Sequence, residues 1–289
     1  MDTLRDMRFR WDWLRPVMRA PYVPALGPMP PEAITADLFN AVLDVAGTGE
    51  FLPFDKDRRW TARKDERVLV DQVMHTSAET LVPALTTRGG GLVKLYHYAA
   101  TDPDPAELSP LGERLAREHG AASGHRIIWF SDRPDRAHGR VMVKRFTEAD
   151  DGPVDGVQPL ADCEAADGFG AFAAEIGPEG FQHLYQRMKA GHQDGPTLVA
   201  VADDRIVGAV GPLSVVDGPD RRTLQQPAYF AVHPSYRGQG HGRRLWRASM
   251  AWGRSNGSDA KVLQASRGSA AESLYLSEGL ETHGYVCRT

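Results

Sequence analysis

Residues 237–242, with the sequence Arg-Gly-Gln-Gly-His-Gly, constrain the fold of this chain more than any other feature. They lie between an apolar, strand-like segment at 229–232 and a helix-like segment at 243–256. Glycines at alternate positions allow backbone conformations that other residues avoid, and they let a ligand approach the main chain closely. The first amides of the following helix point outward at the positive end of its dipole. This order predicts a site for phosphate or pyrophosphate, where Arg237 and Arg243 can add charge-assisted hydrogen bonds.

Two well-known phosphate-binding turns fit residues 237–242 poorly. A Walker loop, GxxxxGK(S/T), is excluded because no lysine followed by serine or threonine closes this run. A dinucleotide-binding turn, GxGxxG, would begin at Gly238 and Gly240, but Arg243 occupies the place of its third glycine. Asp259 lies at a tolerable distance for the carboxylate that binds ribose, so this alternative is disfavoured rather than excluded.

A third turn pattern, (Q/R)xxGx(G/A) after a strand ending in Val-x-Pro, is matched in full by residues 232–234 and 237–242. In this turn the chain resembles the GNAT superfamily of N-acyltransferases, whose members bind the pyrophosphate of coenzyme A there. The resemblance implies acetyl-CoA as co-substrate, with its pantetheine arm hydrogen-bonded to the main chain of the strand before the turn. The implied cofactor-binding residues are Phe230, Ala231, Val232, Arg237, Gly238, Gln239, Gly240, His241, Gly242 and Arg243.

The sequence beyond this turn also resembles the family, in its NxxAxxLYxxxGF segment. The matching residues stand at the right intervals and are Ala271, Leu274, Tyr275 and Gly279. Gly268 takes the place of the asparagine, which puts one side-chain contact to the cofactor in doubt, and Leu280 replaces the phenylalanine. An ordinary helix that ends in a glycine cap would explain Gly279, but not its joint spacing with the upstream turn.

The resemblance implies a GNAT fold, of class α/β (α+β), in which helices flank a mixed central sheet that is splayed at the cofactor wedge. Residues 139–289 are predicted to form this acyltransferase domain. Within it, a hairpin is predicted over residues 197–216, with its turn at residues 203–204. Residues 224–232 form the next predicted strand, which in the family splays from the strand at 261–265.

The chemistry implied by the resemblance assigns Tyr275 as the catalytic residue that donates a proton to the leaving thiolate; a core tyrosine is the alternative. The amide of Val232 would face the thioester oxygen and stabilise the charge that develops on it. An amine must lose a proton before it attacks, so a base is required. The candidates, for each of which a solvated surface carboxylate is the alternative, are Glu175, Glu179, Asp217 and Asp220. Attack is expected to be direct, with Cys163 and Cys287 as buried bystanders.

The N-terminal half carries weaker signals. Residues 1–30 are predicted to form a proline-rich extended arm. Residues 31–138 are predicted to form an α/β domain that opens with a helix ending at Gly47. A second helix is predicted from about Thr61 into the seventies, because apolar residues recur there at helical spacing.

Within this half, strand-like residues 92–98, a loop, a helix-like segment and strand-like residues 126–130 repeat the order of the C-terminal motif. The loop at 102–110 has carboxylates and prolines where a pyrophosphate needs glycines and arginine. The segment therefore fits a degenerate GNAT-like repeat without a cofactor site. An unrelated α/β domain explains the same order equally well.

Composition places the chain among ordinary globular proteins, since 289 residues with 42% hydrophobic and 25% charged side chains suffice for two compact units. Two cysteines form no disulfide framework, which favours the cytoplasm. No secretory signal and no apolar stretch of bilayer length is found, so no membrane partner is expected. The net charge of -4 predicts no nucleic-acid partner, and no HxxxH or HExxH spacing predicts a metal site.

Together these patterns predict an N-acetyltransferase that transfers an acetyl group from acetyl-CoA to the amine of a small-molecule acceptor, within a ternary complex. A protein lysine or N-terminal acetyltransferase is one alternative. The family branch that modifies ribosomal protein N-termini has a glutamate where this chain has Leu263 and Gln264, so that alternative loses support. A non-catalytic acyl-CoA sensor is the other alternative, and a homodimer stays open as the assembly.

Overall fold

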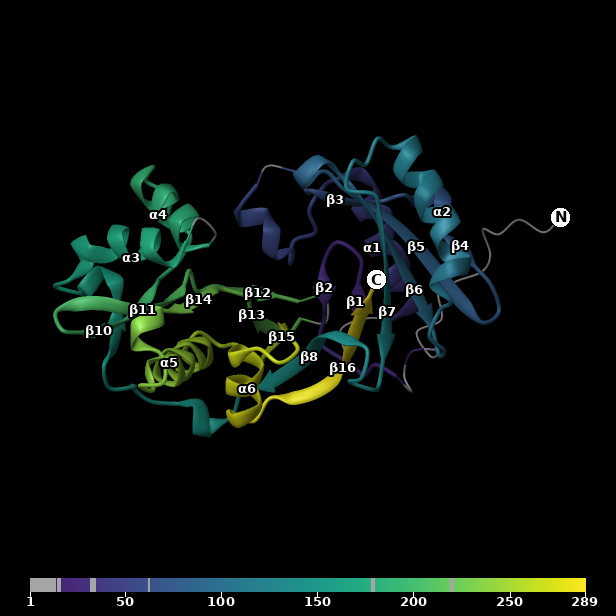
Figure 1. The fold of residues 1–289 in the computed structure, drawn as a ribbon. Helices are drawn as coiled ribbons and strands as arrows, with labels where there is room; N and C mark the ends of the chain where they lie inside the picture. Colours follow the sequence, from purple (N-terminus) through teal and green to yellow (C-terminus); the bar gives the residue numbers. More distant parts are fainter. Residues whose placement is uncertain (1–13, 15–16, 32–34, 62, 178–179, 219–220) are drawn as a thin grey trace. The chain divides into compact units, whose positions relative to one another are not determined.

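The computed structural model describes residues 14, 17–31, 35–61, 63–177, 180–218 and 221–289 of the chain. The chain forms two compact units: unit 1 combines residues 1–143 with 262–289, and unit 2 consists of residues 144–261. Strands β8 (Ala137–Arg145) and β15 (Ala260–Ser266) pass from one unit into the other (Figure 1). In this division the last helix and the last strand belong to the same compact unit as the N-terminal half. The predicted segments 1–30, 31–138 and 139–289 instead follow motifs along the sequence. These domain boundaries stay a prediction.

Unit 1 is built on a mixed sheet with the strand order β8-β16-β7-β6-β5-β3, and β4 also pairs with β5. Its further strands are β3 (Glu66–Val68), β4 (Met74–His75), β5 (Glu79–Thr86), β6 (Leu92–Ala99), β7 (His125–Ser131) and β16 (Glu281–Arg288). Strands β6 and β7 run parallel, with Val93 opposite His125. A parallel pair needs a crossover connection, which helix α2 (Pro105–Glu118) supplies. The predicted order of strand, loop, helix and strand in this half is confirmed, but α2 begins at Pro105, inside the predicted loop at 102–110.

Helices α1 (Ala36–Thr48) and α2 belong to the two different cores of this unit. Tyr98 of β6 lies in the core cluster of Phe39 from α1, and the two rings meet edge-on with centroids 5.5 Å apart. Leu95 of the same strand lies in the core cluster of Leu115 from α2. Because consecutive side chains of a strand point to opposite faces, β6 contributes to both cores.

Two expectations for this half are wrong. Helix α1 continues past Gly47, and Gly49 ends it as a left-handed cap with a φ of 77°. Gly47 instead permits close packing, because a Cβ at this position would lie 2.5 Å from Cγ2 of Val70. The helix predicted from Thr61 is not formed by the described residues, since residues 63–75 contain β3 and β4, which pair with β5. Hydrogen bonding to a neighbouring strand outweighs the apolar spacing there.

The described part of the predicted arm, residues 14 and 17–30, packs onto unit 1. Leu14 and Met18 are almost completely buried in the core cluster that contains α1. Strands β1 (Tyr22–Val23) and β2 (Gly27–Pro28) form a short hairpin. The Tyr98 hydroxyl donates a hydrogen bond of 2.7 Å to the carbonyl of Tyr22. The described part of the arm thus folds into a turn and a hairpin instead of the predicted extended segment, and it forms part of the core.

Unit 2 contains an antiparallel sheet with the strand order β14-β11-β10-β9. Its strands are β9 (Val157–Pro159), β10 (Leu198–Ala202), β11 (Arg205–Gly211) and β14 (Tyr229–Val232). Its helices are α3 (Phe169–Ile176), α4 (Phe181–Lys189) and α5 (His241–Ser255). The predicted hairpin is confirmed: β10 and β11 pair, and Asp203 and Asp204 turn between them with φ values of 49° and 55°. A cluster around Phe169, Phe172 and Phe181 forms much of the core.

The predicted strand at 224–232 is interrupted and serves two sheets. Its first part, β13 (Thr223–Gln225), pairs with β12 (Val215–Asp217) and, in parallel, with Ala260 of β15. Its last part, β14, pairs with β11 instead. Pro227 stands between them and has no amide hydrogen to offer a strand partner. The chain is a mixed α/β protein, as predicted, and β14 leaves the pairing of β13 just before the glycine-rich turn.

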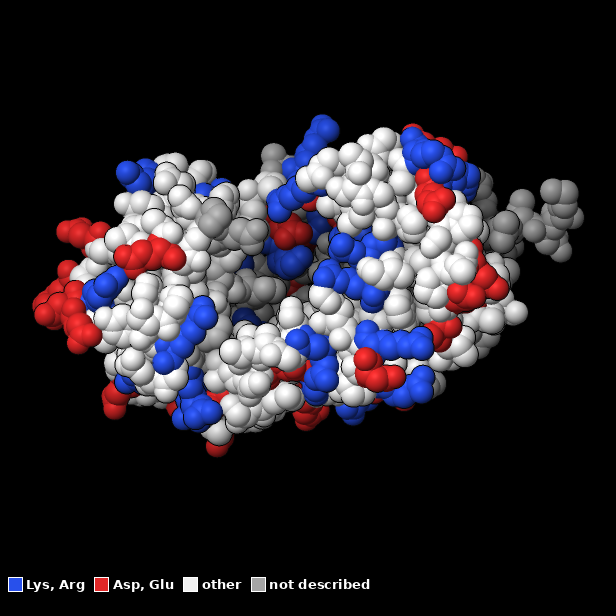
Figure 2. All heavy atoms as spheres, viewed as in Figure 1, with Lys and Arg blue, Asp and Glu red and all other residues white. Residues whose placement is uncertain are grey.

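The surface carries both signs of charge. On the face shown in Figure 2, basic and acidic side chains are interspersed, and acidic ones gather over the end of unit 2 that carries the β10–β11 hairpin. Within the described part of the chain, every helix is too short or too polar to cross a membrane.

Glu272 anchors helix α6 (Ala270–Ser277) within unit 1. Its side chain is 6% exposed and accepts hydrogen bonds from Arg140 Nε at 2.6 Å and Arg267 Nη1 at 2.7 Å. The amide of Gly268 donates a third, also of 2.7 Å. Burial alone would raise the pKa of Glu272, but the bonds from Arg267, Gly268 and Arg140 outweigh it and lower the pKa to about 2.

The Glu272→Gln variant is expected to lose about 2 kcal/mol of unfolding free energy at pH 7, because a neutral amide cannot pair with two guanidinium groups. A folded-state pKa below the ordinary value of 4.5 means that this contribution is present above about pH 4.5 and fades as the pH falls towards 2. Urea unfolding at pH 7 and pH 3 should therefore show a smaller difference from the wild type at pH 3. Glu118→Gln, which removes an exposed pair with Arg114, is the control and should cost about 0.5 kcal/mol or less. An equal loss at both pH values would contradict the prediction.

Candidate functional site

The glycine-rich turn adopts the backbone that its sequence predicts. Gly238 and Gly240 have φ values of 79° and 86°, in the left-handed region that residues with a Cβ rarely adopt. A Cβ built on either glycine would meet no heavy atom within 4 Å. The two glycines are therefore required by conformation, and the space beside them is open to a ligand.

Helix α5 begins at the end of this turn, at His241, two residues earlier than predicted. Gly240 is its N-cap and supplies no side-chain hydrogen bond to the first turn. The first hydrogen bond within the helix runs from the Arg244 amide to the Gly240 carbonyl, at 3.1 Å. Helix geometry leaves the amides before Arg244 without an intrahelical acceptor, and they lie at the positive end of the dipole. The order of strand, glycine turn and helix is confirmed, and its free helix end suits an anion.

A network from three other elements fastens the chain between β14 and the turn. His233 Nδ1 accepts a hydrogen bond of 3.3 Å from the Ser235 amide, and its Nε2 lies 3.2 Å from Oε2 of Glu175 on α3. Arg205 of β11 donates to the same carboxylate oxygen at 2.8 Å. The Tyr236 hydroxyl adds a bond of 3.1 Å to Asp203. These contacts position the turn within unit 2.

The side chain of His241 faces the interior of unit 2 rather than the turn. It is 6% exposed, and because a guanidinium only donates, Nδ1 accepts the hydrogen bond of 3.0 Å from Arg244 Nη2. Burial and, after it, the Arg244 charge lower the pKa of His241. His241 is therefore neutral at pH 7 and can contribute its main-chain amide to the predicted cofactor site.

Strand β14 is an edge strand of its sheet, and its ladder decides which backbone groups face outward. The His233 amide donates to the Val207 carbonyl at 2.8 Å, so His233 belongs to the residues that bond to β11. In an antiparallel ladder these alternate with residues that point away. Ala231 thus bonds to β11, whereas the backbone groups of Phe230 and Val232 point away from it. Arg237 Nε lies 3.3 Å from the Val232 carbonyl, on that outward side.

The ten predicted cofactor residues all lie in unit 2, at 230–232 and 237–243, while the predicted catalytic residue lies in unit 1. Tyr275 is on α6, three residues after the anchored Glu272, and is half-buried. Burial raises the pKa of Tyr275 to about 12. The hydroxyl is therefore protonated at neutral pH and able to donate.

The candidate bases differ in their surroundings. Glu175 is held by Arg205 and His233, as a structural carboxylate would be. Asp217 is exposed and accepts a bond of 3.1 Å from the Thr223 hydroxyl. Glu179 and Asp220 lie outside the described residues. The pairing of Glu175 with His233, 58 positions later in the chain, was not foreseen, because no local pattern links a helix carboxylate to a distant histidine.

Both cysteines are buried and unpaired. Burial and the charges of Asp102 and Asp135 raise the pKa of the Cys287 thiol to about 11, which makes it a poor nucleophile. Among the described residues no three histidine, cysteine, aspartate or glutamate side chains are grouped as ligands for a metal ion.

Residues 193–281 match the family described as acetyltransferase (GNAT) domain. No curated protein sequence matches the chain. Similar solved structures include a GCN5-related N-acetyltransferase from Sphaerobacter thermophilus, at 14% identity and a TM-score of 0.48, covering 90% of this chain and 86% of that one. A tandem GNAT protein from the clavulanic acid biosynthesis pathway, at 13% identity, also has a TM-score of 0.48, covering 92% of this chain and 97% of that one.

Gly240→Ala is expected to weaken the binding of coenzyme A about tenfold, because alanine disfavours the φ of 86° that aims the first amides of α5. Calorimetric titration with coenzyme A measures the effect. Gly257→Ala, near the other end of α5, is the matched control: its φ is 76°, and a Cβ there also meets nothing within 4 Å. Both variants should lose about 1 kcal/mol of stability, and only the first should lose affinity. Equal affinities would show that the turn is not the binding site.

Proposed function

Because residues 193–281 carry a GNAT acetyltransferase domain, we propose that this chain transfers an acetyl group from acetyl-CoA to the amine of a small molecule. The observation that carries the proposal is the turn at Gly238 and Gly240, whose left-handed backbone opens the N-terminus of α5 to an anion. The pyrophosphate of the cofactor would accept hydrogen bonds from the amides of residues 238–243, with Arg237 and Arg243 adding charge.

The edge of β14 would hold the pantetheine arm. The outward carbonyls and amides of Phe230 and Val232 offer the pattern that an added strand needs, and the cofactor's amide groups can supply the partner atoms. By the same alternation, the backbone groups of Ala231 bond to β11. Ala231 would therefore hold β14 in place. The outward amide of Val232 would stabilise the oxyanion that forms on the thioester carbonyl.

Two proton transfers complete the reaction: the acceptor amine loses one proton, and the departing thiolate receives another. The acceptor amine must be deprotonated before attack, and a carboxylate such as Asp217 or a water chain would take that proton. The amine nitrogen then forms a bond to the carbonyl carbon, and the C–S bond breaks as the thiolate leaves. Tyr275, whose hydroxyl stays protonated because its pKa is about 12, would donate to that sulfur. The high pKa of the Cys287 thiol supports direct attack over an acyl-cysteine intermediate.

We propose that this protein works in the cytoplasm, because its two cysteines are buried and form no disulfide.

The activity can be tested with purified full-length chain, acetyl-CoA and a panel of small amines, with release of the free thiol as the readout. Turnover of a small amine supports the proposal. Acetylation of peptide lysines or N-termini alone would favour a protein acetyltransferase. Binding of acetyl-CoA without turnover of any acceptor would favour a sensor.

Tyr275→Phe is expected to lower kcat about 100-fold and to leave the KM for acetyl-CoA nearly unchanged, because only the proton donor is removed. Steady-state rates at saturating substrates measure the change. The control is Tyr185→Phe, on α4 in unit 2, which removes a hydroxyl from a tyrosine packed against Phe169 and should keep the full rate. A Tyr275→Phe enzyme with an undiminished rate would rule out this donor.

A further inference from the structure

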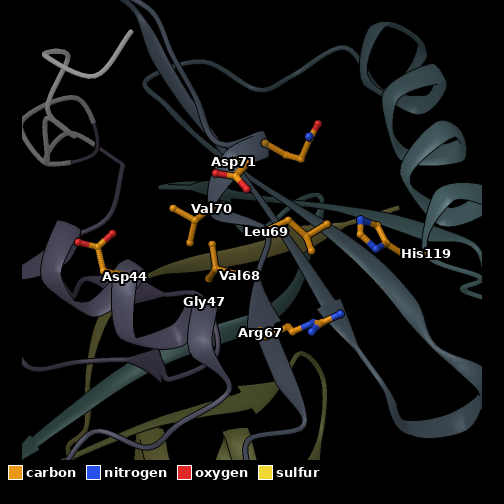
Figure 3. A pocket seen from close by; sticks show the side chains of 9 residues that line it. Asp44, Gly47, Arg67, Val68, Leu69, Val70, Asp71 and His119 are labelled. Atoms are coloured by element: carbon orange, nitrogen blue, oxygen red, sulfur yellow. The ribbon is translucent and has the colours of Figure 1, made fainter. Parts of the chain in front are cut away.

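A pocket in unit 1 has no place in the proposed acyl transfer. It lies between α1, strand β3, the turn at residues 70–72 and the residue that ends α2, and has a volume of about 360 Å³ (Figure 3). This volume lies within the range of small-molecule sites. Gly47 helps to form it, since the lack of a side chain lets α1 come close to Val70. The close packing of α1 on β3 therefore creates the pocket.

Four ionisable side chains line this pocket: two aspartates, one arginine and one histidine. Figure 3 shows Asp44 at the left and Asp71 above the centre, with Val70 between them, while Arg67 lies below Leu69 and His119 to its right. All four residues are exposed, and within the described part of the chain none of their side chains forms an ion pair or a hydrogen bond. Carboxylates and a guanidinium thus line one hollow without forming an ion pair with each other.

The two sides select for different groups. Asp44 lies near the C-terminal end of α1, where the negative end of the dipole adds to the attraction of the two carboxylates for a cation. Arg67 presents a planar fork of donors that matches a carboxylate, and His119 adds a further ring nitrogen. A ligand with a single charge would satisfy one side and leave the other unpaired, so the pocket discriminates against it.

We propose that this pocket binds a small zwitterion, namely an amino acid or a short peptide with free termini. Its ammonium group would lie on the side of Asp44 and Asp71, its carboxylate on Arg67 with His119 beside it, and its apolar portion on Leu69 and Val70. The proposal does not depend on acyl transfer, and it is tested without acyl-CoA.

The test is titration of the isotope-labelled full-length chain, followed by NMR, with L-leucine and leucyl-leucine as probes. At least one zwitterion should bind saturably with a Kd of about 1 mM or below. Leucinamide, which lacks the carboxylate, and N-acetylleucine, which lacks the ammonium, should each bind about tenfold more weakly. Equal binding of all four compounds, or no saturable binding of either zwitterion, would overturn the proposal.

Two variants with substitutions at exposed residues of the pocket test whether the zwitterion binds there. Arg67→Gln and Asp71→Asn should each weaken the zwitterion about tenfold, and each should unfold at the wild-type temperature because neither side chain is packed. Arg133→Gln, whose side chain is 69% exposed outside the pocket, is the control and should bind as the wild type does. Unchanged binding in both pocket variants would overturn the proposal even if a zwitterion binds elsewhere.

Discussion

The candidate site depends on a backbone constraint: two glycines held at positive φ directly before a helix. Gly238 and Gly240 turn the chain so that the N-terminus of α5 has no capping side chain. A residue with a Cβ would disfavour this turn, and a capping serine or aspartate would occupy the amides that an anion needs. Strand β14, which leads into the turn, is an edge strand with outward backbone groups at Phe230 and Val232. The proposed phosphate site and the proposed site for an extended arm therefore follow each other along one stretch of chain.

Unit 1 shows the same order of elements without such a site. Strand β6 leads through a loop into α2, and β7 follows, as β14 leads into α5 and β15. The Asp104 side chain caps α2 by accepting from the Ala106 amide at 2.8 Å, and Pro105 has no amide hydrogen. Strand β7 also pairs with β6 in parallel, so this edge of β6 is closed. A negative cap and a closed edge explain why this order alone does not make an anion site.

Sequence patterns predicted those elements whose conformation depends on residues close together in the chain. The alternation of the β10–β11 hairpin, the turn glycines and the start of α5 all depend on residues close in sequence. The helix expected from Thr61 failed because residues 66–68 gain more from pairing with β5, a partner that periodicity does not reveal. The strand expected at 224–232 failed for a related reason, since Pro227 divides it between two sheets.

The sequence by itself determined the backbone of the glycine-rich turn, because Gly238, Gly240 and the strand before them act through conformations fixed within a few residues. Tertiary structure decided what holds that turn and what surrounds it. The Glu175 carboxylate meets His233, and Glu272 meets Arg140 across 132 positions of chain. The ionisable side chains that line the pocket at α1 likewise come from four segments of the chain. Such contacts depend on how helices and strands pack, and no spacing along the chain encodes them.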